Sequence, residues 1–288
     1  MRGLAIISIA LSMAASILGL LVLFAGRKNG FLSDTYIIKV DTTNLTLNTS
    51  NTGNSVLDNI LNSATPGTVN TTAERLGLRD FYKVFVMNFC EGDRDSNNKQ
   101  ISNCTKQKGM FTFNPVSTFN NQLLQGVKLQ DLGVKTLELE NDIKVLNVAY
   151  KTMFVTYCGG IAAAGVIMIL GALGFFGGRL IECANMMFAV ISFLFLGIAS
   201  GIGTAAGFKI CDAINHEMGK IGIRASHSKM YLGMTWAPVT CMLILTFLWC
   251  GACLSRGKDK THHKDAGKRK SGGHKSDRAK RSWRKRKH

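Results

Sequence analysis

Cys90 and Cys104 are the residues of this 288-residue chain whose type and placement best fit a defined chemistry. Both lie in one polar segment, residues 27–151, within runs whose aromatic and β-branched content favours strands. Two facing strands would bring the thiols within bridging distance, and a disulfide closing a loop of this size contributes about 3 kcal/mol of stability. No second Cys or His pair stands nearby at zinc-ligand spacing. We therefore predict a structural disulfide.

The same segment carries Asn-x-Ser/Thr glycosylation sequons. N-glycans are added only on the lumenal side of a membrane, which is also where disulfides form and persist. Both features therefore predict that residues 27–151 lie on the non-cytoplasmic side, with the alternative that an Asn-rich loop contains sequons by chance. The candidate glycosylation sites are Asn44, Asn48, Asn70 and Asn103.

The other cysteines allow more than one interpretation. Cys183, Cys250 and Cys253 fall near the predicted cytoplasmic boundary, where cysteines are candidates for S-palmitoylation. A buried apolar role for these three is the alternative. Cys211 is either a partner for Cys158 or a free thiol.

The C-terminal tail, residues 256–288, contains 15 Lys/Arg against 3 Asp/Glu. An unfolded basic tail next to a membrane attracts anionic lipid at about 1 kcal/mol per basic residue near the surface. Cortical proteins are the other candidate partners, and a solvated tail without a partner is the alternative. Nucleic-acid binding is disfavoured because the tail follows an apolar segment. The candidate lipid-binding residues are Lys268, Arg269, Lys270, Arg284, Lys285, Arg286 and Lys287.

Motifs for catalysis are missing from the sequence. It contains no HExxH zinc motif, no phosphate-binding glycine loop and no nucleophile elbow. The chain has four long apolar runs, the first of which begins at Leu4, and they hold no Asp, Glu, Lys, Arg or His, although proton relays and ion pathways usually need such residues in the membrane. We therefore predict a protein that is not an enzyme, with no cofactor and no metal.

Four apolar segments must position these residues. They cover residues 1–26, 152–178, 183–208 and 230–255, and each uncharged run exceeds the roughly 20 residues that a membrane-spanning helix needs. The predicted fold class is a membrane all-α protein, a four-helix transmembrane bundle with a small disulfide-bonded β unit in the first extracellular loop. For the first segment, a cleaved signal peptide is the alternative to a retained anchor.

The predicted topology rests mainly on the tail. A strongly basic segment directly after a span belongs in the cytoplasm, so four spans place both termini there. Residues 27–151 and 209–229 then form the two extracellular loops. The short loops oppose this orientation, because residues 209–229 hold four Lys/Arg. The 15 Lys/Arg of the tail outnumber these four, so we retain the orientation that the tail predicts.

The first loop changes character along its length. Residues 34–72 are Asn-rich and predicted to be irregular. Residues 76–120 form the predicted β unit, with a strand at 81–90 and a second at 110–113. Residues 122–151 show a leucine-rich helical stripe, which predicts either a connector or a partner-binding helix that continues into the second span.

Small residues recur within the spans. Gly197 and Gly201, and Gly203 and Gly207, are spaced by four, which lets helices approach closely in lipid. Packing within one bundle is the first interpretation, and a homo-oligomer is the second.

A family resemblance follows from the string Phe85-Val86-Met87-Asn88-Phe89-Cys90-Glu91-Gly92, then Cys104, then Phe111-Thr112-Phe113-Asn114-Pro115. Together with the claudin-like tetraspan layout, it resembles the fungal Sur/PalI family of cortical-patch, eisosome and pH-response membrane proteins. The Trp that claudins place before the first Cys is absent, and Phe89 occupies the nearby aromatic position.

The resemblance implies a multi-pass plasma-membrane protein that organises a cortical membrane domain and is linked to endocytosis or cell-wall integrity. A PalI-type accessory of ambient-pH signalling is the alternative that the same family implies. An auxiliary subunit of a channel, or a cell-fusion factor, is a third possibility. The resemblance supplies no catalytic residues.

Overall fold

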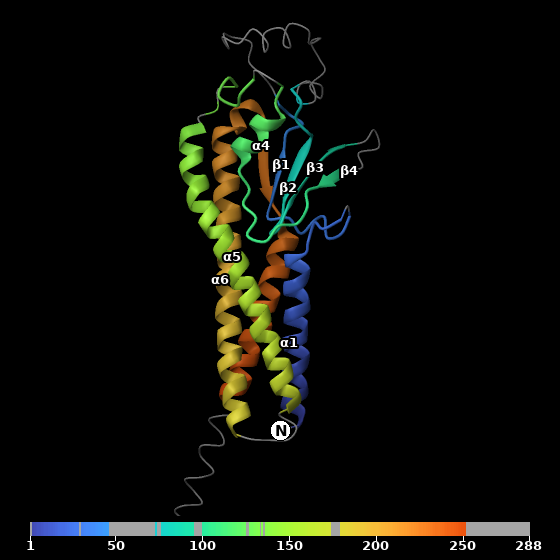
Figure 1. Ribbon diagram of the computed structural model, residues 1–288, viewed down its shortest axis with the longest axis vertical. Helices are drawn as coiled ribbons and strands as arrows, with labels where there is room; N and C mark the ends of the chain where they lie inside the picture. The colour runs from blue at the N-terminus through green and yellow to red at the C-terminus, as the bar shows by residue number, and fades with distance from the viewer. Residues whose placement is uncertain are drawn as a thin grey trace, which may run out of the picture.

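Four long apolar helices form a bundle in the computed structural model of the chain (Figure 1). Successive helices run in opposite directions, which confirms the predicted four-helix fold. The structure describes residues 2–28, 30–45, 73, 76–94, 100–124, 127–132, 134, 136–173 and 179–251. The helices are α1 (Arg2–Leu23), α5 (Thr136–Leu173), α6 (Arg179–Glu217) and a fourth, the C-terminal helix, Lys229–Gly251.

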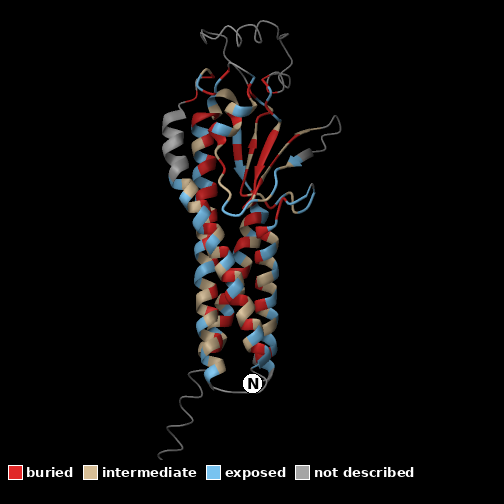
Figure 2. Ribbon diagram, viewed as in Figure 1, coloured by how far each residue is buried: buried red, intermediate tan, exposed pale blue. Residues whose placement is uncertain are grey.

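The bundle is apolar outside and carries hydroxyl groups inside. Large apolar side chains such as Ile169 and Phe247 are more than 60% exposed, which suits a surface facing lipid. Figure 2 shows exposed and half-buried positions along the whole length of the bundle helices. Inside, the Ser192 hydroxyl donates to the Gly160 carbonyl at 2.9 Å. The Trp249 indole N–H donates to Ser8 at 3.2 Å, which joins the C-terminal helix to α1.

A five-stranded antiparallel sheet stands at one end of the bundle. Its strands are β1 (Ile38–Asp41), β2 (Phe81–Val84), β3 (Phe89–Arg94), β4 (Gln100–Cys104) and β5 (Arg224–His227). The order is β4-β3-β2-β1-β5. The first four strands come from residues 27–151, and β5, from the predicted loop 209–229, adds the fifth strand beside β1. The predicted antiparallel unit is confirmed and also extends into the second loop.

Two helices continue beyond the bundle to support this sheet. The 39 residues of α6 span about 58 Å at 1.5 Å per residue, nearly twice a hydrocarbon core of about 30 Å. Figure 1 shows α5 and α6 rising beside the sheet, whereas α1 ends below it.

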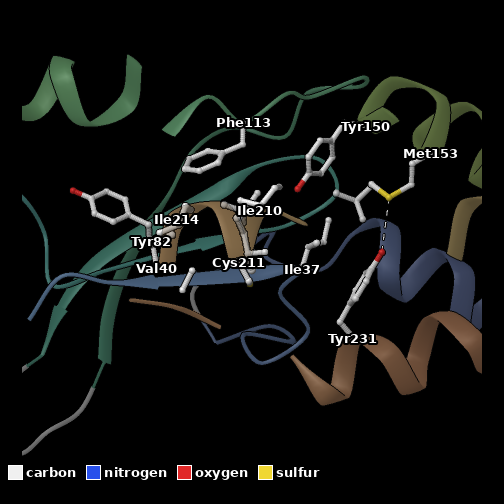
Figure 3. Close-up of a cluster of buried hydrophobic side chains, with 14 of the residues drawn as sticks. Ile37, Val40, Tyr82, Phe113, Tyr150, Met153, Ile210, Cys211, Ile214 and Tyr231 are labelled. Atoms are coloured by element: carbon white, nitrogen blue, oxygen red, sulfur yellow. Dashed lines mark hydrogen bonds between the residues drawn. The ribbon is translucent and has the colours of Figure 1, made fainter. Parts of the chain in front are cut away.

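Side chains from the sheet and from the extended helices share one core. Ile37 and Val40 lie against Ile210 and Ile214 in a continuous apolar cluster (Figure 3). The short helix α4 (Pro115–Gln122) covers another side of the sheet, where Phe119 meets the Tyr82 ring at 5.0 Å. The sheet and the helix extensions therefore form a single apolar core.

Several predicted boundaries are wrong. The strand predicted at 81–90 is two strands, β2 and β3, joined by a turn at 85–88. Residues 110–113 form no strand, because Phe111 and Phe113 pack their rings against Phe89, at 6.2 and 5.8 Å, while the backbone stays outside the ladder. The second strand of the stapled hairpin is β4 instead.

The boundaries of two loops also need correction. The Asn-rich region 34–72 contains β1, which is held by ladders on both of its edges. The helix predicted from residue 122 begins at Thr136, because α4 ends at Gln122 and residues 123–124, 127–132 and 134 are not helical. The predicted loop 209–229 is mostly ordered, as α6 runs to Glu217 and β5 follows.

Candidate interaction surface at the stapled sheet

The Cys90–Cys104 disulfide joins two directly paired residues of β3 and β4. The sulfur atoms are 2.06 Å apart and the Cα atoms 4.0 Å. This confirms the predicted disulfide. β4 is an edge strand and is hydrogen-bonded to the sheet only through β3. The disulfide therefore adds a covalent link to a strand that has a backbone ladder on one side only.

The turn after β2 is fastened to the end of α1. The Asn88 side-chain amide donates to the Gly26 carbonyl at 2.8 Å and to the Thr105 carbonyl at 3.1 Å. Gly26 has φ +74°, and any Cβ there would come within 2.5 Å of the Phe85 ring. The first helix and the stapled hairpin therefore hold a fixed relation to each other.

One face of the sheet carries a pair of lysines in place of an apolar pair. Lys39 on β1 stands directly opposite Lys83 on β2. Their ammonium groups lie 5.5 and 5.6 Å from the centre of the Phe81 ring, and Lys83 is also 5.5 Å from the Tyr36 ring. We call these four residues, together with Asp34, the lysine face.

The lysine face holds its charges away from water. Only 7% of the Lys83 side chain and 14% of the Lys39 side chain are exposed. Burial lowers the pKa of both lysines. Asp41, 3.9 Å from Lys39, and Asp34, 3.6 Å from Lys83, oppose that effect only in part. Burial also raises the pKa of Tyr36. Holding two like charges side by side away from water costs stability, which the two carboxylates and the contacts with the aromatic rings offset in part.

Charged residues also line a small polar pocket at the far end of β2 and β3. Arg79 and Arg94 alternate with Asp80 and Asp93 around a volume of about 390 Å³. Arg79 pairs with Asp93 at 2.7 Å, and Arg94 reaches Asp41 at 2.7 Å. Such an arrangement can donate and accept hydrogen bonds with a polar ligand. Within the described residues, no group of three or more His, Cys, Asp or Glu is placed to hold a metal ion.

The predicted modification sites are scattered. Asn44 is exposed just after β1, and Asn103 is exposed on β4 beside the disulfide, so both are accessible to a glycan. Cys183 is exposed and Cys250 half-buried, at the end of the bundle away from the sheet. Asn48, Asn70, Cys253 and the basic residues of the tail lie outside the described residues.

The Cys158–Cys211 pairing considered from the sequence is not formed. Cys158 is exposed on α5, whereas Cys211 is buried on α6, and both are thiols. Sequence reasoning also missed the lysine face. Its signal was the alternation of Ile38 and Val40 with Lys39 and Asp41, which is typical of a strand with one buried face.

Comparison with known proteins gives one match. A family model described as the SUR7/PalI family matches residues 4–248, from the first helix to near the end of the fourth. Comparisons with curated proteins and with solved structures found no match.

Proposed function

Because the chain belongs to the SUR7/PalI family of membrane proteins, we propose that it is a non-enzymatic organiser of a cortical domain of the plasma membrane. The observation that carries the proposal is the rigid sheet, which both polar segments build and which a disulfide and the Gly26 contacts fix on the bundle. A surface so constrained suits lasting contact with a neighbouring protein or with the cell wall.

The orientation belongs to the proposal. The sheet would face the exterior, with glycans on Asn44 and Asn103, and both chain termini would be cytoplasmic. The tail, at +12 net charge from 15 Lys/Arg and 3 Asp/Glu, would hold anionic lipid or a cortical protein. Palmitoylation at Cys183 or Cys250 would add a second attachment at the same membrane face.

Microscopy of the tagged full chain in a fungal host tests the role. We expect stable cortical patches with slow fluorescence recovery. Neutralising the two basic blocks of the tail to Gln should disperse them, whereas a shuffled tail of the same composition should not if the charge acts on lipid. Uniform, freely diffusing protein with the tail intact would contradict the proposal.

A role in ambient-pH signalling is the second candidate, and the lysine face is the observation that favours it. Burial lowers the pKa of Lys39 and Lys83, so both should lose their charge at a lower pH than an exposed lysine does. Deletion of the chain should then impair growth at alkaline pH, and the Lys39→Met/Lys83→Met variant should not restore it. Normal alkaline growth with altered patches would favour the first role.

A further inference from the structure

A groove of about 650 Å³ runs between α5 and α6 on the outside of the molecule. Its walls are apolar, with Val145 and Ala149 from α5 and Ile202 and Ala206 from α6. Lys209 and Asp212 stand on its α6 side, towards the sheet end. This volume lies within the range of about 300–1,000 Å³ typical of small-ligand sites.

The groove crosses the level at which the membrane ends. The uncharged run of α6 stops at Phe208, so Ile202 and Ala206 lie within it and Lys209 lies just beyond. A hydrocarbon core of about 30 Å takes about 20 residues of this helix, which places the lower part of the groove against lipid tails. Its upper part then stands among the lipid headgroups of the leaflet nearer the sheet.

The two charges are ordered along the membrane normal. Asp212 follows Lys209 by one helical turn on the same side, about 4.5 Å further from the membrane centre. Both are exposed, and the ion pairs found among the described residues involve other side chains. Glu217 at the outer end is buried, and its carboxylate contacts His216 at 2.8 Å, so Asp212 is the exposed carboxylate of the rim. The rim is therefore cationic near the membrane and anionic beyond it.

We propose that the groove binds one phospholipid whose headgroup carries both a phosphate and an ammonium group. In such a lipid the acyl chain points into the bilayer, the phosphate follows, and the ammonium stands outermost. The part of the groove at Ile202 and Ala206 would hold the acyl chain, Lys209 the phosphate and Asp212 the ammonium. This inference does not depend on the proposed cortical role, because it uses only the geometry of α5 and α6.

Native mass spectrometry of the purified full chain in detergent tests the site. The probes are phosphatidylcholine, phosphatidylglycerol, which lacks the ammonium, and diacylglycerol, which lacks both charges. We expect one phosphatidylcholine to bind about tenfold more tightly than either of the others, because only its choline group can form an ion pair with the Asp212 carboxylate. Equal binding of phosphatidylcholine and phosphatidylglycerol would overturn the proposal.

Two variants separate this site from general lipid contact. Exchanging the charges, Lys209→Asp with Asp212→Lys, keeps the net charge but reverses its order, and should remove the preference for phosphatidylcholine. Ala205→Phe fills the groove from its exposed lining and should abolish the bound lipid, whereas Ala162→Phe, an exposed alanine of α5 outside the groove, should not. Unchanged binding in Ala205→Phe, or a dimer that this variant alone disrupts, would also overturn the proposal.

Discussion

The sheet end of the molecule and the transmembrane bundle keep their shapes by different means. At the sheet, position depends on directed bonds, namely the Cys90–Cys104 disulfide, the strand ladders and the Asn88 amide on Gly26. In the bundle it depends on how closely helices approach, with glycines and hydroxyls at the contacts. Covalent and charge changes should therefore affect the sheet most, whereas changes in side-chain volume should affect the bundle most.

The largest effect should come from opening the disulfide. Cys90→Ala/Cys104→Ala should lower the free energy of unfolding by about 3 kcal/mol, because the edge hairpin loses its cross-link. Thermal unfolding of the full chain in detergent measures it. Reductant should bring the wild type to the level of the variant, and Cys158→Ala, at an exposed thiol, should change little. An unchanged melting temperature would show that the ladder alone holds the edge.

Adding one methyl group inside the bundle should rank second. A Cβ on Gly203 would collide with the Tyr231 hydroxyl and lie 2.9 Å from the Met153 sulfur, so Gly203→Ala should cost about 2 kcal/mol. The matched control is Gly201→Ala on the same helix, where no atom lies within 4 Å of the new Cβ. Equal effects of the two variants would break the distinction between packed and open glycines.

The lysine face should respond in the opposite direction. Lys83→Met removes a buried charge that its surroundings disfavour, so stability should rise by about 1 kcal/mol at neutral pH. Lys106→Met, at an exposed lysine, is the control. A clear loss of stability in Lys83→Met would mean that Asp34 and the aromatic rings more than compensate for burial.

The same variant should alter the dependence of stability on pH. Between the lowered pKa values of Lys39 and Lys83 and the ordinary value of 10.5, the unfolded chain binds more protons than the folded one. The free energy of unfolding should therefore rise with pH in that window. Part of this rise should disappear in Lys83→Met, as chemical unfolding at several pH values would show.

The smallest effect should come from a buried hydroxyl of the bundle. Thr235 bonds Tyr157 and, at 2.9 Å, Ser200. Thr235→Val should cost about 0.6 kcal/mol, the average for a hydrogen bond between membrane helices. Thr240→Val, whose exposed hydroxyl bonds only its own helix at Ala237, is the control. A cost near that of the disulfide would mean that directed bonds govern the bundle as well.

The same contrast explains which features could be read from the sequence. The four helices were predictable because an uncharged run of over 20 residues has few other uses, and Cys90 and Cys104 were the two cysteines of their segment. β4 and β5 were not, because Gln100–Cys104 and Arg224–His227 have little strand character and pair only when a partner edge is present. Desolvation of Lys83 likewise depends on Phe81 and Tyr36, which only the folded sheet brings together.

Because of β5, the two halves of this chain contribute strands to the same sheet. β1 is bonded on one edge to β2 and on the other to β5, which comes from the half of the sequence after α5. A chain severed between Leu173 and Arg179 would thus give two fragments that must complete the same sheet and the same bundle. The two fragments could therefore serve as a split reporter, because the sheet would form only where both fragments are present in the same membrane.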